Sequence, residues 1–164
     1  MFRKQYHPAP KTAPTLPIDI PSGIRLTDLI GRVEAFRGKP MRILEVAELE
    51  GESLCGLWLA TETEDLVLHA PSASPLHREQ FILHEFAHML LRHDENPKHA
   101  VDAIAGTPAA PDATLVELAD GPVMQVMARD GFEHSDELEA ETLADHLAHR
   151  LRHRRSSKFS EVFG

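Results

Sequence analysis

Five consecutive residues, His84-Glu85-Phe86-Ala87-His88, carry groups that could do chemistry. On an α-helix, residues i and i+4 lie about 40° apart around the axis and one turn apart along it, so both imidazoles would project from one face. Two imidazoles so placed can ligate one divalent cation, and zinc binds histidine nitrogen at about 2.0–2.1 Å. Glu85 lies next to the first histidine, where its carboxylate could take a proton from water without binding the metal. The motif therefore predicts two zinc ligands and a general base within one turn.

A zinc site needs a third protein ligand, and one known source is a histidine soon after the helix, in the order HExxHxxGxxH. In this chain Leu91 occupies the position of the glycine and Asp94 the position of the third histidine. His93 is one residue short of that position, and we expect it to be exposed at the end of the helix. This source of a third ligand is therefore excluded.

The other source is a carboxylate from a later helix, which we expect from about residue 133 to residue 153. Glu137, Glu141 and Asp145 follow one another at intervals of four residues and share one face of that helix. Either Glu137 or Glu141 could complete the zinc site, and a neighbouring carboxylate could accept a hydrogen bond from a ligating histidine. Taken alone, the same face would also fit a solvated acidic surface.

The spacing of apolar residues along the rest of the chain predicts the helices and strands that position these residues. Helical spacing of apolar residues predicts an N-terminal helix over about 25–37 and a second, buried helix over about 77–92 that carries the histidines. Strand-like runs occupy three segments, 41–48, 54–61 and 66–70, and a short helix is expected over 122–129. The fold class is thus α+β, with a three-stranded antiparallel sheet and a C-terminal helix that bears the glutamates. The strand 54–61, which contains Trp58, is a candidate edge against which an extended substrate could pair.

The length of 164 residues fits one domain. Five prolines within residues 1–22 indicate a flexible arm, and we expect the domain to span residues 23–155. Residues 94–132, rich in Asp, Pro, Gly and Ala, are expected to form a long loop or insertion within it. Residues 156–164 are expected to be a tail.

The formal net charge is −9, from 26 acidic and 17 basic residues, which argues against nucleic acid as a direct ligand. No apolar run reaches the roughly 18 residues that a membrane span needs, and the N-terminal segment lacks the apolar stretch of a secretory signal. We expect a cytoplasmic protein that does not contact a membrane.

The two motifs together resemble the ImmA/IrrE family of zinc metallopeptidases, over about residues 23–150. The family's second motif, E-x-E-A-N-x-F-A, is similar to Glu137-Leu138-Glu139-Ala140-Glu141-Thr142-Leu143-Ala144. In this register Glu137 takes the position of the third ligand and Glu141 replaces the asparagine, whereas a shift of one turn would place Glu141 there. The chain departs from the family in lacking the Leu-Leu-Met-Pro ending and in the long segment between its motifs.

The resemblance implies a small zincin-like domain, Zn²⁺ as cofactor, and metallo-endopeptidase activity. Family members cleave DNA-binding repressors or antitoxins at specific sites, and many carry their own helix-turn-helix domain. This chain has no room for such a domain, so a helix-turn-helix regulator in trans is the implied substrate. The alternative is a zincin-like binding module that sequesters a regulator without cutting it. The intact set of His84, Glu85 and His88 favours the peptidase.

Overall fold

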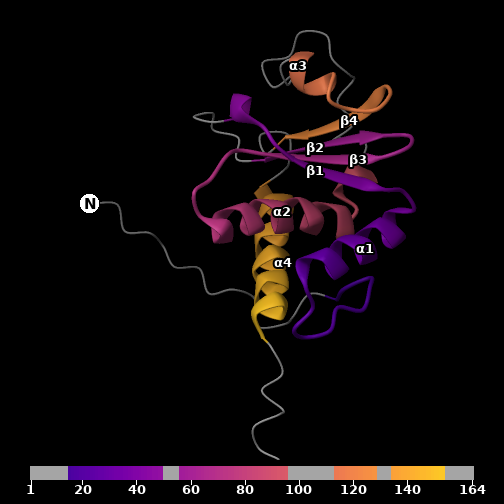
Figure 1. The fold of residues 1–164 in the computed structure, drawn as a ribbon. Helices are drawn as coiled ribbons and strands as arrows, with labels where there is room; N and C mark the ends of the chain where they lie inside the picture. Colours follow the sequence, from indigo (N-terminus) through magenta and orange to yellow (C-terminus); the bar gives the residue numbers. More distant parts are fainter. Residues whose placement is uncertain (1–14, 50–55, 96–112, 129–133, 154–164) are drawn as a thin grey trace, which may run out of the picture.

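The computed structural model describes residues 15–49, 56–95, 113–128 and 134–153. Within these residues, four helices and four strands follow one another with two short 3-10 turns, η1 and η2 (Figure 1). In chain order they are α1 (Leu26–Arg37), β1 (Met41–Glu45), η1 (Ala47–Leu49), β2 (Gly56–Thr61), β3 (Asp65–His69), α2 (Pro75–Leu90), η2 (His93–Glu95), α3 (Ala113–Val116), β4 (Val123–Ala128) and α4 (His134–Arg152).

The strands form one four-stranded sheet in the order β1-β3-β2-β4. β2 pairs antiparallel with both β3 and β4, whereas β1 pairs parallel with β3. The α+β class is thus confirmed, but the expectation of a three-stranded antiparallel sheet is wrong. The chain direction reverses from β1 to β2 and again from β2 to β3, so β3 runs in the same direction as β1. Because β3 lies between β1 and β2 in the sheet, it pairs parallel with β1.

The fourth strand, β4, occupies the segment for which a short helix was predicted. A short apolar run does not distinguish a strand from a helix by its period alone, and here pairing with β2 decides the structure. Gly121, with φ of +104°, lies in the turn just before it. Because β4 covers one side of β2 and β3 the other, β2 is not an edge strand. Trp58 is fully buried in β2, and the predicted substrate edge there is also wrong.

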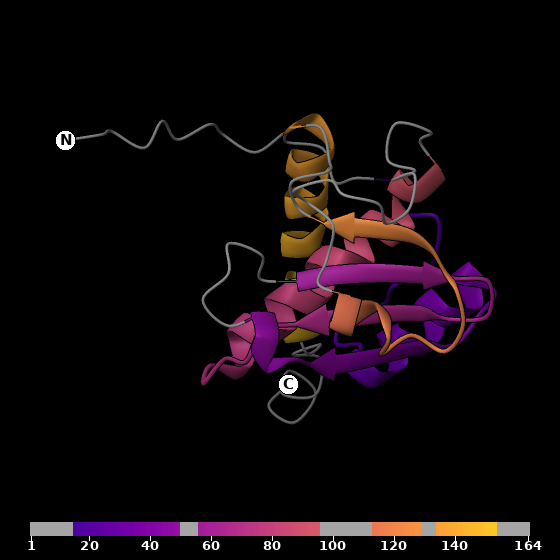
Figure 2. The same ribbon diagram turned by 90° about the horizontal axis from the view of Figure 1, so that it is seen from above.

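Helices α1, α2 and α4 all lie on one face of the sheet, and α3 lies on the other (Figures 1 and 2). Alternate residues of β2 therefore belong to different apolar clusters: Trp58 and Ala60 face the three helices, and Leu57 and Leu59 face the side of α3. Burial on both faces explains why this strand reads as a continuous apolar run rather than an alternating one.

α4 crosses α2 at a steep angle in Figure 1, and the two pack tightly. The residues of α4 that face inward include Ala140, Ala144 and Ala148, which are at most 3% exposed. Small side chains at these positions let the two backbones approach closely. α2 begins at Pro75, behind the N-cap Ser74, and the C-terminal half of the helix is almost wholly buried.

The chain before α1 also contributes to the core. Ile20 is buried, and Leu16 and Ile18 pack against the same cluster, so the packed region begins before residue 23. Residues 1–14 and 154–164 lie outside the described residues, and the predicted arm and tail stay predictions. Within the described ranges, no helix has the length and apolar character needed to cross a lipid bilayer.

Candidate metal centre

The crossing of α2 and α4 brings two histidines and one glutamate together. His84 Nε2 and His88 Nε2 lie 3.1 Å apart, and each lies 3.2 Å from one of the two carboxylate oxygens of Glu137. In a tetrahedral zinc site with bonds of about 2.0–2.1 Å, neighbouring ligand atoms lie about 3.3–3.4 Å apart. The two imidazole nitrogens are thus spaced much like neighbouring zinc ligands, and the three side chains offer donor atoms close enough together to hold one ion.

Burial and charge set the protonation of this cluster. His88 is 1% exposed, and burial lowers the pKa of its imidazole to about 4. Burial raises the pKa of Glu137, but hydrogen bonds from His84 and His88 outweigh this effect and leave it at about 2. At neutral pH the imidazole of His88 is therefore neutral and the carboxylate is ionised, which are the forms that bind a cation.

Of the two glutamates proposed as third ligand, the structure brings Glu137 to the histidines. Glu141, one turn further along α4, lies on the wall of a neighbouring pocket instead. The inward positions Ala140, Leu143, Ala144 and Leu147 fix how α4 lies on α2, and its position along the axis decides which glutamate reaches the pair.

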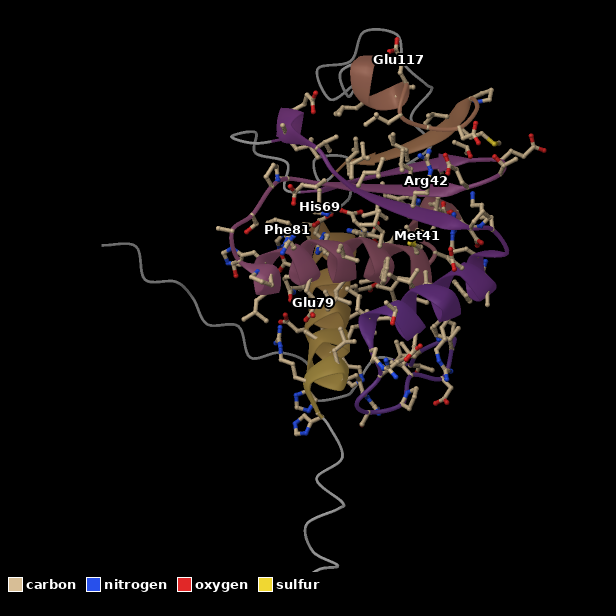
Figure 3. All side chains as sticks on the ribbon, in the orientation of Figure 1. Met41, Arg42, His69, Glu79, Phe81 and Glu117 are labelled. Carbon is tan, nitrogen blue, oxygen red and sulfur yellow. The ribbon has the colours of Figure 1, made fainter. Side chains whose placement is uncertain are left out.

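The carboxylate of Glu85 lies against the start of β2. It is 6% exposed, and a Cβ atom placed on Gly56 would lie 3.1 Å from its Oε1. The absence of a side chain at Gly56 therefore makes room for the carboxylate. Gly56 pairs across the sheet with His69 of β3, which Figure 3 labels together with Phe81 of α2.

A pocket of about 260 Å³ opens beside His84 and Glu85. Its lining comes from β2, α2 and α4 and consists of Gly56, Gln80, Phe81, His84, Glu85, Glu141 and Asp145. The Gln80 amide donates a hydrogen bond to Asp145 across it, at 3.2 Å. The predicted base thus borders a space that a ligand could enter.

The expectation that His93 is exposed at the end of the helix is wrong. Its side chain is 8% exposed, and its Nδ1 lies 2.8 Å from Nδ1 of His88. Its Nε2 faces α4, at 3.8 Å from Asp136 Oδ1 and 3.5 Å from Glu139 Oε2. Nothing in the spacing of the motif indicated this contact, because it depends on how the chain turns after α2.

Comparisons of this chain with protein families, with curated proteins and with solved structures gave no match.

Proposed function

We propose that this protein is a zinc-dependent metallo-endopeptidase in which His84, His88 and Glu137 hold the ion. The observation that carries the proposal is a pair of imidazole nitrogens 3.1 Å apart, each 3.2 Å from a different oxygen of one carboxylate, on two helices far apart in the sequence. Zinc held there would act as a Lewis acid and would lower the pKa of water toward about 7.

Glu85 is the residue to which we assign proton transfer. It follows the first histidine directly, and both residues line the same pocket. An oxygen of this carboxylate would accept a proton from the attacking water and then deliver it to the leaving amine nitrogen. The low exposure of Glu85 limits competition from bulk solvent.

The pocket is the place where we expect a peptide to meet Glu85. Phe81 and Gly56 supply apolar surface, while Glu141 and Asp145 supply carboxylates. Like charges repel, so an acidic substrate side chain would be disfavoured there. The net charge of −9 would likewise attract a partner with a basic surface.

The resemblance to the ImmA/IrrE family supports a particular class of substrate, a helix-turn-helix regulator or antitoxin supplied in trans. DNA-binding proteins carry the positive surface that an acidic protein attracts. On this proposal the fold is zincin-like, and the protein acts in the cytoplasm, where such regulators work.

The test is to incubate the purified protein with a helix-turn-helix regulator encoded beside it, with added zinc, with a chelator, and with the Glu85→Gln variant. A peptidase gives new fragments only with zinc and an intact Glu85, while Glu85→Gln retains its metal. A stable complex without fragments would instead identify a binding module. Cleavage by Glu85→Gln at the rate of the unaltered protein would refute the assigned base.

A further inference from the structure

His93 contacts the centre because α2 ends just before it. On a continued helix, the fifth residue after His88 would lie about 140° around the axis, far from its ring. Instead Leu91 ends the helix and Arg92 takes a left-handed conformation with φ of +54°, so the chain turns into η2. This turn returns His93 to His88, with ring centroids 5.0 Å apart.

Proton counting fixes the direction of the hydrogen bond between these two histidines. A neutral imidazole has one N–H group and one nitrogen with a lone pair. If His88 Nε2 offers its lone pair to a metal, its proton lies on Nδ1, which then donates to Nδ1 of His93 at 2.8 Å. His93 must accept there, so its own proton lies on Nε2. That N–H group faces the carboxylates of Asp136 and Glu139.

The same counting argues against a second metal site. His93, Asp136 and Glu139 offer ligand atoms close enough together to hold another ion. To bind it, His93 would need its lone pair on Nε2 and its proton on Nδ1. Two N–H groups would then face each other at 2.8 Å, because His88 also carries its proton on Nδ1. The two metal sites therefore cannot both be occupied while His88 and His93 stay hydrogen-bonded through their Nδ1 atoms.

We propose that His93 is a positioning residue for the metal centre. Its Nδ1 accepts a hydrogen bond from the Nδ1–H group of His88. This hydrogen bond holds the ring of His88 in the tautomer and orientation that direct its Nε2 toward Glu137 and His84. The carboxylates of Asp136 and Glu139 favour the complementary tautomer of His93. Residues that hydrogen-bond a ligating histidine in this way usually change metal affinity by about 10–100-fold when they are replaced. The inference rests on the proposed function, since it takes His88 as a ligand.

The experiment compares zinc affinity in the unaltered full chain with that of His93→Leu and His93→Asn, by competition with a chromophoric chelator. Leu removes the acceptor, and zinc should bind about 10–100-fold more weakly. Asn places an amide oxygen close to where Nδ1 lies and should restore most of the affinity. His149→Leu, on the exposed side of α4, is the matched control and should bind zinc as the unaltered protein does.

Two further readouts separate positioning from a general effect on folding. Every variant should bind one zinc per chain, and nitrogen NMR of the zinc-loaded protein should show the proton of His93 on Nε2. Equal affinities in His93→Leu and the unaltered chain would overturn the proposal. So would two ions per chain that fall to one in His93→Leu, since His93 would then be a ligand.

The outcomes also distinguish this inference from the proposed function. If the chain bound zinc as described but cleaved no regulator, the peptidase would be refuted and the role of His93 would stand. If the chain bound no zinc, or if Glu137→Gln bound it unchanged, the centre itself would be refuted together with the role of His93.

Discussion

At the scale of single residues, the centre depends on which carboxylate of α4 faces α2. Glu137 lies 3.2 Å from the Nε2 atoms of both His84 and His88, whereas Glu141 borders the pocket. Both glutamates fit the sequence motif in one of its two registers. The two lie one turn apart on the same face, so the position of α4 along its axis separates them, and this position follows from the packing of its alanines and leucines against α2.

The first prediction uses this difference between two glutamates on one helix. Glu137→Gln should lose zinc, because one of three protein ligands is replaced by a neutral amide, while Glu141→Gln should keep one zinc per chain. The measurement is metal content after dialysis against a weak chelator. Retention by Glu137→Gln with loss by Glu141→Gln would assign the third ligand to the other glutamate.

A second prediction concerns the room that Gly56 leaves for Glu85. In Gly56→Ala the new Cβ would lie 3.1 Å from Glu85 Oε1, so the carboxylate must shift by a few tenths of an ångström. Because a misplacement of 1 Å can cost about 100-fold, we expect kcat to fall about tenfold, with zinc retained.

The control for this substitution is Gly31→Ala, where nothing lies within 4 Å of the added atom. Gly31 lies within α1, so alanine should stabilise that helix by about 0.5–1 kcal/mol and leave kcat unchanged. Peptidase activity in Gly56→Ala equal to that of Gly31→Ala would show that the position of Glu85 does not limit the reaction.

At the scale of elements, a buried charged network ties α1 to the sheet and to the turn that carries His93. Arg37, at the end of α1, donates to Asp65 of β3 at 2.8 and 3.1 Å and to Asp94 of η2 at 2.7 Å. The indole N–H of Trp58 also donates to Asp65, at 2.9 Å. The network therefore fixes the residue next to His93 while it satisfies a fully buried carboxylate.

The third prediction is that Arg37→Ala destabilises the fold strongly. Asp65 is 0% exposed and would lose the guanidinium, although the ammonium of Lys39 stays 3.4 Å away, and breaking a buried pair typically costs about 3–5 kcal/mol. The free energy of unfolding in urea measures this. Arg32→Ala, which removes a partly exposed pair with Asp19, should change it by less than about 1 kcal/mol. Similar losses in the two variants would contradict the role given to the network.

The elements that sequence reasoning predicted are those with a strong local period. The helices of Leu26–Arg37, Pro75–Leu90 and His134–Arg152 each bury a patterned face, and their predicted bounds differ from the observed ones by at most two residues. Strand β4 and the parallel pairing of β1 with β3 were missed, because pairing between strands depends on distant segments. The contact of His93 was missed for a related reason, since it requires a left-handed residue at Arg92.

At the scale of the whole molecule, the proposed centre would join two segments separated by about fifty residues of chain. α2 and α4 already share one apolar cluster with α1 and the sheet. Their ligands sit where the N-terminal turn of α4 meets the middle and end of α2. A metal ion bound there would add a crosslink at the N-terminal end of α4, directly after residues 129–133.

The fourth prediction is that zinc stabilises the folded protein through Glu137. An ion that binds the folded state alone stabilises it by about 2.7 kcal/mol at 100 times Kd, which corresponds to a rise in Tm of about 5–10 °C for a chain of this size. Thermal unfolding with zinc or with a chelator measures the rise, which should vanish in Glu137→Gln and persist in Glu141→Gln. An equal rise in both variants would mean that zinc binds outside the proposed centre. Amide hydrogen exchange would show where the zinc binds, because a crosslink between α2 and α4 should slow exchange most in the first turns of α4.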